Sequence, residues 1–339
     1  MDDSRGSPTG VPVQITRNNM RYEVNIVKAF KDKNIPTLGN PAGVLVVEKM
    51  PSPEDMKQVA VQAKQPMTAF VCPRDDGGKN FDVRYYDLGG RECHICGHAT
   101  IAATAQLVRE KPELKGQDFS FHLNPSYFNG EDKTLVTHVR GDEISIDLFP
   151  SILRQEHDEK LYRKVASVLG IRREDIDAIA FSTNVRDYVV ALKDPDVILD
   201  MKPDFKAMKE MAEQAPFQHE GLMVSSLAPK DAGCDLYVRV FLPITGVNED
   251  IACGSGNCSI VPFWHDRGLN QDTRTYKAIF PYPEGPKGYL GGIQKIEYSP
   301  SQNRITIASD TEFEKTEVIV LPSARLIHGG NDCGLADGA

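Results

Sequence analysis

The sequence predicts an α+β protein with two pseudo-symmetric domains, each a curved mixed β-sheet around one central helix. A chain of 339 residues exceeds what one hydrophobic core usually supports, so two domains are expected. Strand-like segments outnumber helical ones, which disfavours a doubly wound parallel sheet, where strands and helices alternate one for one. The third observation is a motif that occurs once in each half.

This motif ends in Cys-Gly, followed by a helix-like stretch. The two copies read ECHICGHAT over residues 92–100 and EDIACGSGN over residues 249–257. Each copy has a glutamate four residues before its cysteine, and a strand-like run containing an arginine further upstream. Small and apolar residues after each Cys-Gly can continue as a buried helix. Because the copies lie about half the chain apart, duplication is the simplest explanation, and it puts a shared site between the domains.

The first half reads as a flexible tail followed by a strand-rich domain. Residues 1–20 are polar, without period, and we expect them to form the tail. Pro53 to Ala63 predicts a helix that buries one face, with Ser52 as its N-cap. Alternating and β-branched runs predict strands at 22–30, 43–48, 68–72, 81–86, 119–123, 134–139 and 143–148. The N-terminal domain is therefore expected over 21–149.

Pro150 begins a break in composition, after which a second domain is expected over 150–325. Helices are predicted at 157–169 and 204–213 besides the one after the second Cys-Gly. Strands are predicted at 176–181, 187–192, 221–226, 234–241, 273–280, 292–298, 304–309 and 316–321. Residues 326–339 are expected to be a second flexible tail.

Bulk composition narrows the class of function. The formal net charge is −9, and no run rich in lysine or arginine interrupts the acidic background, which argues against nucleic acid as a partner. No apolar stretch approaches the roughly 20 residues that span a bilayer, and no signal-peptide pattern opens the chain. We therefore expect a cytoplasmic protein without a membrane partner, in which the seven cysteines are reduced thiols.

The repeated motif predicts a two-base isomerase. A helix N-terminus offers unpaired amide groups and partial positive charge, so it binds carboxylates and lowers the pKa of a thiol beside it. If Cys96 and Cys253 faced one carbon of a small carboxylate, one thiolate could remove its proton while the other thiol returned one to the opposite face. Such chemistry inverts a stereocentre or moves a double bond without metal or cofactor, so we expect neither.

Several neighbours of the two cysteines are candidates for supporting roles. Gly97, Gly254 and Gly256 would let a ligand approach the backbone closely. The glutamates of the two motifs are expected to pair with the upstream arginines, Glu92 with Arg84 and Glu249 with Arg239. Asp250 could orient a substrate ammonium, and His98 would lie near a bound carboxylate.

A zinc site is the main structural alternative for the first motif. Cys93, Cys96 and His98 have ligand-like spacing. Zinc is disfavoured because Cys96 cannot both ligate a metal and act as a free thiol, and because only one cysteine recurs in each half. The remaining cysteines are read as small buried hydrophobes.

Four motifs in the same order resemble the phenazine-biosynthesis (PhzF-like) family. They are GNPAGV at 39–44, CGHAT at 96–100, NED at 248–250 continuing to GSG at 254–256, and, more loosely, GYLGG at 288–292. The resemblance spans about residues 22 to 321. It implies the diaminopimelate epimerase fold that this family shares with proline racemases, a cofactor-independent isomerase that is often a homodimer, and Asn40 as a substrate contact.

The sequence departs from that family at two positions. Phenazine-type members use a glutamate where Met67 stands here, and they usually have threonine where Cys253 stands. The pair Cys96 and Cys253 therefore resembles the two thiols of the epimerase and racemase branch.

We predict a racemase or epimerase of an amino acid or related carboxylate, which Gly97, His98, Gly254, Ser255 and Gly256 bind. The alternatives are a lyase, cyclase or double-bond isomerase of natural-product biosynthesis, and a catalytically inactive binding scaffold.

Overall fold

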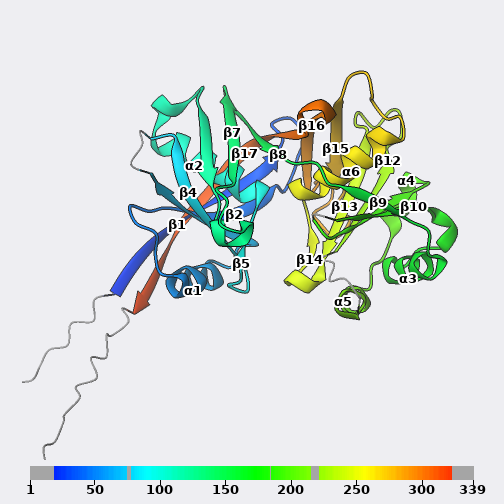
Figure 1. Ribbon diagram of the computed structural model, residues 1–339, viewed down its shortest axis with the longest axis horizontal. Helices are drawn as coiled ribbons and strands as arrows, with labels where there is room; N and C mark the ends of the chain where they lie inside the picture. The colour runs from blue at the N-terminus through cyan, green and yellow to red at the C-terminus, as the bar shows by residue number, and fades with distance from the viewer. Residues whose placement is uncertain (1–18, 75–77, 184, 215–220, 323–339) are drawn as a thin grey trace, which may run out of the picture.

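The protein is dominated by β-structure, with few helices. The computed structural model describes residues 19–74, 78–183, 185–214 and 221–322. Within them the strands form one hydrogen-bonded network of mixed parallel and antiparallel pairs. Figure 1 shows two lobes side by side, one around α2 (Gly97–Glu110) and the other around α6 (Gly254–Asp266). The predicted sheet-rich α+β class is confirmed.

The first lobe contains the elements up to β8 together with the end of the last strand (Figure 1). Besides α2, its elements are β1 (Asn19–Lys31), β2 (Asn40–Val46), α1 (Pro53–Ala63), β3 (Met67–Pro73), β4 (Asn80–Asp87), β5 (Glu92–Cys93), β6 (Asp118–His122), β7 (Thr134–Arg140) and β8 (Glu143–Leu148). Two short 3₁₀ turns cover Pro112–Leu114 and Pro125–Phe128.

The second lobe follows from β9. Besides α6, its elements are β9 (Leu153–Glu156), α3 (Glu159–Leu169), β10 (Ile176–Ser182), β11 (Tyr188–Leu192), α4 (Pro195–Asp200), α5 (Phe205–Gln214), β12 (Leu222–Leu227), β13 (Leu236–Leu242), β14 (Val247–Asp250), β15 (Thr275–Phe280), β16 (Gly292–Ser299) and β17 (Arg304–Pro322). Short 3₁₀ turns cover Arg173–Asp175, Pro243–Thr245 and Pro300–Gln302.

The strand pairings of the first lobe recur in the second. In the first lobe β2 is parallel to β3, β3 is antiparallel to β4, and β4 is parallel to β6. In the second lobe β11 is parallel to β12, β12 is antiparallel to β13, and β13 is parallel to β15. Each lobe places a short strand and then a buried helix between the last two strands of this series.

Each central helix is buried along almost its whole length because a sheet curves around it. Most residues of α2 and α6 are buried, and both helices belong to one hydrophobic core that also takes in strands of both lobes. The outer faces of the sheets are covered separately, by α1 in the first lobe and by α3 and α5 in the second. Ser52 caps α1 by accepting from the Asp55 amide at 3.1 Å, as predicted.

A proline inside α6 ties the linker between the lobes to this helix. Pro262 has no N–H, so the carbonyl of Cys258, four residues earlier, has no intrahelical donor. That carbonyl instead accepts from the amide of Ser151 at 2.8 Å. The Ser151 and Ser259 hydroxyls lie 2.6 Å apart and complete the contact.

The last strand crosses between the lobes. Residues 304–308 of β17 pair with β16, and 305–309 pair with β8. From 310 to 322 the same strand pairs with β1. The domain limits of 21–149 and 150–325 stay a prediction, and the pattern of the last strand alone did not reveal that it meets β1.

The glutamates of the two motifs pair with the upstream arginines, as predicted. Arg239 holds Glu249 by two bonds of 2.8 and 2.9 Å, and both side chains are buried. Arg239 also donates to the carbonyl of Ile198 near the end of α4. The pair between Arg84 and Glu92 is looser, at 3.8 Å, and about one fifth exposed.

The predicted strands and helices are found, with shifts of a few residues at their ends, except that the separate strands predicted at 304–309 and 316–321 are one continuous strand, β17. The sequence did not predict the short elements β5, β9, β14 and α4, because two to six residues carry too little periodicity. Residues 19 and 20, expected in the N-terminal tail, begin β1. The rest of that tail and residues 326–339 lie outside the described residues. In the described part of the chain, no helix is long and apolar enough to cross a membrane.

The two arginine–glutamate pairs should differ in their contribution to stability. Replacing Glu249 by alanine leaves a buried guanidinium without its counter-charge, and we expect the free energy of unfolding to fall by about 3–5 kcal/mol. The matched change Glu92→Ala affects a half-buried, longer pair and should cost about 1 kcal/mol. Urea denaturation of both variants measures the difference, and equal losses would contradict this account.

Candidate active site

The two cysteines of the repeated motif are the N-cap residues of the two central helices. Cys96 precedes α2 and Cys253 precedes α6, each with extended backbone angles. Their side chains are buried, with exposed fractions of 8% and 3%. The two helices contact each other, and the charge of Asp250, just before the second turn, acts on Cys96 in the first.

The first thiol lies against an imidazole and the first turn of α2. The Cys96 sulfur is 3.4 Å from Nδ1 of His98. The backbone amides of Ala99 and His98 act to lower the pKa of this thiol. Its backbone is fixed by a buried chain of hydroxyls, in which Tyr85 lies 2.6 Å from the Thr100 hydroxyl and Thr100 donates to the Cys96 carbonyl.

The second thiol has an equivalent arrangement with different chemistry. Ser255 stands two residues after Cys253, as His98 does after Cys96, and its hydroxyl is 3.3 Å from the Cys253 sulfur. The amide of Gly256 acts to lower the pKa of this thiol, as the amides of α2 do for the first. A hydroxyl therefore occupies the place that an imidazole occupies in the first lobe.

One carboxylate, that of Asp250, acts on both thiols. Its charge raises the pKa of Cys96, of Cys253 and of His98. Asp250 Oδ1 accepts from the Asn40 side chain at 2.7 Å and from the Ala252 amide at 3.2 Å. The same Asn40 nitrogen donates to the Ala252 carbonyl at 3.1 Å. The buried amide of Asn40, expected to contact substrate, thus has protein partners that join β2 to the loop before α6.

Burial decides the protonation of the two thiols. It raises the pKa of Cys96 and of Cys253 far above the ordinary thiol value, and this outweighs the helix amides, which lower it. The helix N-termini therefore act on these pKa values in the expected direction, but burial has the larger effect and the net shift is upward. Burial also lowers the pKa of His98, so the imidazole is neutral.

The glycines of the two turns have packing roles that the sequence did not reveal. A Cβ at Gly256 would meet Val240 at 3.0 Å and Met223 at 3.1 Å, and one at Gly254 would meet Phe30 at 3.2 Å. At Gly97 the nearest atom would be 3.6 Å away, an ordinary contact. Gly254 and Gly256 therefore bring α6 close to its protein neighbours, rather than opening their Cα positions to a ligand.

Two further glycines and one aromatic residue position the second turn, and sequence reasoning did not assign them this role. A Cβ at Gly291 would lie 2.1 Å from the Ile251 carbonyl oxygen, and one at Gly292 would lie 2.6 Å from the Ala252 side chain. Phe30 sits against Gly254 with a positive φ of 58°, a conformation that bulky residues rarely adopt. The sequence feature that could have indicated this role is the pair Gly291–Gly292 in the segment GYLGG at 288–292.

Met67, which stands where phenazine-type members have a glutamate, is half-buried on β3 and packs against the main core.

The zinc alternative concerns the first motif. Among the described residues no group of histidine, cysteine and acidic side chains could hold a metal ion. The spacing of Cys93, Cys96 and His98 is therefore not accompanied by ligand geometry.

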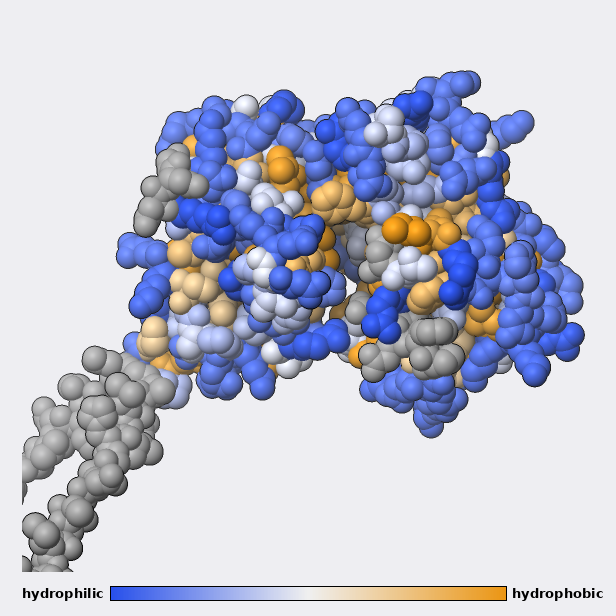
Figure 2. Space-filling view, in the orientation of Figure 1, coloured by the Kyte–Doolittle hydropathy of each residue, from blue (hydrophilic) through white to orange (hydrophobic). Residues whose placement is uncertain are grey.

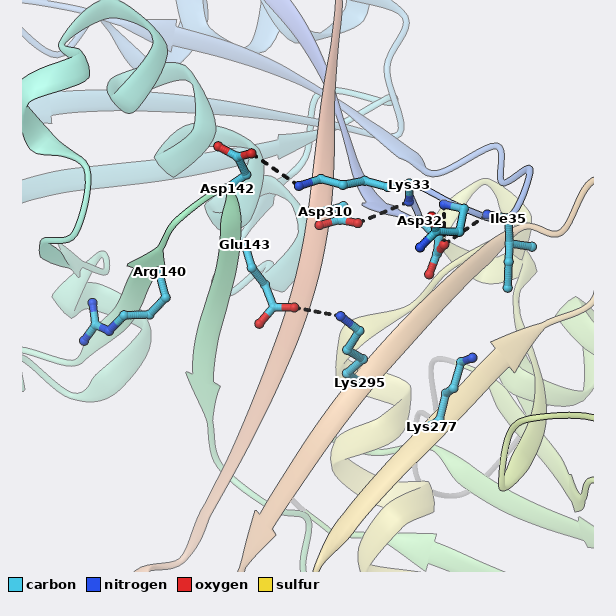
Figure 3. Close-up of a pocket in the computed structure, with 10 residues that line it drawn as sticks. Asp32, Lys33, Ile35, Arg140, Asp142, Glu143, Lys277, Lys295 and Asp310 are labelled. Carbon is cyan, nitrogen blue, oxygen red and sulfur yellow. Dashed lines mark hydrogen bonds and ion pairs between the residues drawn. The ribbon is translucent and has the colours of Figure 1, made fainter.

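A separate hollow of about 500 Å³ lies where elements of both lobes meet (Figure 3). Its lining is ionic and includes the pairs Lys33–Asp142 at 3.3 Å and Lys295–Glu143 at 2.8 Å. Acidic and basic side chains balance there, which gives no preference for an anion. None of the site residues expected from the sequence lines it. Figure 2 shows hydrophobic residues along the junction of the lobes and in further groups on each lobe, on a surface that is largely hydrophilic.

Comparison with known proteins places this fold in a family. The sequence pattern of the phenazine biosynthesis-like protein family matches residues 27–287. The chain therefore belongs to this family, as the four motifs indicated. It is 27% identical over 285 residues to an uncharacterized isomerase of Vibrio cholerae, covering 84% of this chain and 86% of the relative.

Solved structures share the fold. A PhzF-family protein of Enterococcus faecalis, 24% identical, has a TM-score of 0.67 and covers 88% of this chain and 99% of its own. A hydroxyproline epimerase of Agrobacterium vitis, solved with bound trans-4-hydroxy-L-proline, is 11% identical, has a TM-score of 0.56 and covers 91% of this chain and 95% of its own. At these identities the likeness shows the fold alone.

The thiols of the free protein should alkylate slowly near neutral pH. Only the thiolate reacts, and a raised pKa leaves little thiolate until the pH approaches that pKa. Iodoacetamide should therefore label the partly exposed Cys72 and Cys93 before the buried Cys96 and Cys253, and labelling of the buried pair should rise about tenfold per pH unit. Peptide mass spectrometry measures the order, and fastest labelling of Cys96 or Cys253 would contradict the assigned protonation.

Gly291→Ala should loosen only the second turn. The added methyl cannot share space with the Ile251 carbonyl, so the loop before Cys253 must move, at a cost of about 1–3 kcal/mol. We expect faster alkylation of Cys253, unchanged alkylation of Cys96 and a lower melting temperature. Gly89→Ala is the control, because its nearest neighbour would be 3.4 Å away. Equal effects on both cysteines would rule out a local role.

Proposed function

We propose that this protein is a cofactor-independent isomerase of racemase or epimerase type, acting on an amino acid or a related small carboxylate. Cys96 and Cys253 are its two proton-transfer groups. The proposal rests on one observation: a buried Cys-Gly turn begins each of two contacting helices, and the charge of Asp250 acts on both thiols. The isomerase named among the relatives supports the reaction class.

The proposed reaction uses the two helix ends together. One cysteine, as thiolate, takes the proton from the carbon next to the carboxylate, and the other, as thiol, delivers a proton from the opposite side. The first-turn amides of α2 and α6 stabilise the negative charge that develops on the carboxylate oxygens. After one turnover the thiol and thiolate have exchanged roles, so the reverse reaction can follow.

We also propose that the two lobes are duplicated, pseudo-symmetric domains with the diaminopimelate epimerase fold. The recurring order of parallel and antiparallel pairs supports duplication. So do the equivalent positions of α2 and α6. In this division the end of β17 belongs to the first domain, because it pairs with β1.

The partner and location follow from the same proposal. We expect a small carboxylate substrate, and the family resemblance supports a homodimer. The free thiols of Cys96, Cys234, Cys253 and Cys258 accord with a reducing compartment, and we propose the cytoplasm.

Exchange of the α-hydrogen with solvent tests the reaction. The protein should move deuterium from heavy water into the α-position of at least one member of a panel of amino and hydroxy acids, with loss of optical activity. Cys96→Ser and Cys253→Ser should each slow racemisation about 10²–10⁴-fold, because each removes one proton-transfer group. Cys234→Ser, at a half-buried thiol outside the motifs, should keep the rate.

The other outcomes separate the rival functions. A product of changed mass or absorbance would indicate a lyase or double-bond isomerase on the same thiols. Binding of panel members without exchange would indicate an inactive scaffold. Exchange that survives unchanged in both cysteine variants would refute the two-thiol mechanism.

A further inference from the structure

The imidazole of His98 is buried, and one of its nitrogens lacks a protein partner. Its exposed fraction is 8%. Nδ1 lies 3.4 Å from the Cys96 sulfur, whereas Nε2 has no hydrogen-bond partner among the described residues. A buried polar atom without a partner costs about 1–3 kcal/mol. Such an atom beside a reactive thiol is explained when a ligand completes its hydrogen bond.

The protonation of the pair fixes what that ligand must offer. Burial keeps Cys96 as a thiol and His98 neutral. In the tautomer that carries its proton on Nε2, the S–H group donates to Nδ1. We assign this tautomer as part of the inference below, because the unpartnered Nε2 is then a donor, and a ligand with an oxygen acceptor such as a carboxylate completes its hydrogen bond.

We propose that a carboxylate bound at His98 Nε2 drives the proton of Cys96 onto His98 Nδ1, so that the thiolate base forms only when an anionic ligand is present. The S–H bond breaks, the N–H bond forms, the electron pair stays on sulfur, and the total charge is unchanged. This inference rests on the proposed function and adds to it how an otherwise protonated site acquires its base.

Electrostatics favours the transfer only in the liganded site. Without a bound anion, a thiolate and an imidazolium formed in this buried site would each carry a desolvation penalty, and only their mutual attraction would offset the two penalties. A carboxylate bound at Nε2 places the imidazolium between two anions. The charge of Asp250 favours the imidazolium and opposes the thiolate, so the bound carboxylate drives the transfer. The new thiolate already faces the amides of Ala99 and His98 at the start of α2.

The two thiols are not equivalent in this scheme. The place of His98 is taken at Cys253 by Ser255, whose hydroxyl does not hold an extra proton. The charge of Asp250 opposes both thiolates, but at Cys253 a side-chain hydrogen bond with Asp250 also favours the protonated form. Ligand binding therefore makes Cys96 the base and leaves Cys253 as the acid for the first turnover.

Acetate titration tests the transfer without turnover. We expect ultraviolet absorbance of thiolate to rise with acetate, at constant ionic strength, by an amount equivalent to a single thiolate in each chain. Acetamide, which has the same shape without the charge, should cause no rise. The acetate effect should persist in Cys253→Ser and be lost in Cys96→Ser.

His98→Gln separates proton acceptance from ligand binding. Glutamine keeps an N–H donor but cannot hold a proton, so acetate should still raise the melting temperature of this variant without producing thiolate. Stabilisation of the native protein by acetate without thiolate would overturn the inference, as would thiolate formation in His98→Gln or no acetate effect at all. α-Hydrogen exchange is measured separately. α-Hydrogen exchange without acetate-induced thiolate would refute the proton transfer but not the isomerase function. Acetate-induced thiolate without α-hydrogen exchange would refute the isomerase function but not the proton transfer.

Discussion

Each central helix begins at a cysteine that the surrounding sheet shields from water, and most of the site's chemistry follows from this shielding. Amides of the two first turns, those of His98, Ala99 and Gly256, act to lower the pKa of the thiols. Burial disfavours charge, and it outweighs those amides in setting the thiol pKa values. Both sulfurs are thus uncharged, with helix amides that favour an anion and the Asp250 carboxylate that opposes one.

Contacts between the lobes fix the position of the turn that carries Cys253. Asn40 reaches from β2 to Asp250 and the Ala252 carbonyl, and the Gly39 amide donates to the Gly291 carbonyl at 2.8 Å. On the other side of α6, the carbonyl left free by Pro262 receives the linker between the lobes. The turn that carries Cys253 is therefore positioned from both halves of the chain.

The sequence contained the positions of the main elements and of the paired Cys-Gly turns, because these have strong local patterns. It also indicated the Arg239–Glu249 pair, through its repetition in the first half. The sequence did not predict effects that depend on contacts between residues far apart in the chain. The sign of the thiol pKa shift depends on how deeply the sheet buries each helix start. The reason for glycine at 256 is the approach of Val240 and Met223, which no local pattern encodes.

The route of β17 has a consequence for how the protein is made. The strand β1 obtains one of its two neighbours from residues 310–322, which follow the second lobe in the sequence. A ribosome has therefore synthesised the second lobe before the first lobe can close its sheet. Until then one edge of β1 is without its native neighbour, so the first lobe, although it precedes the second in the sequence, is completed after it.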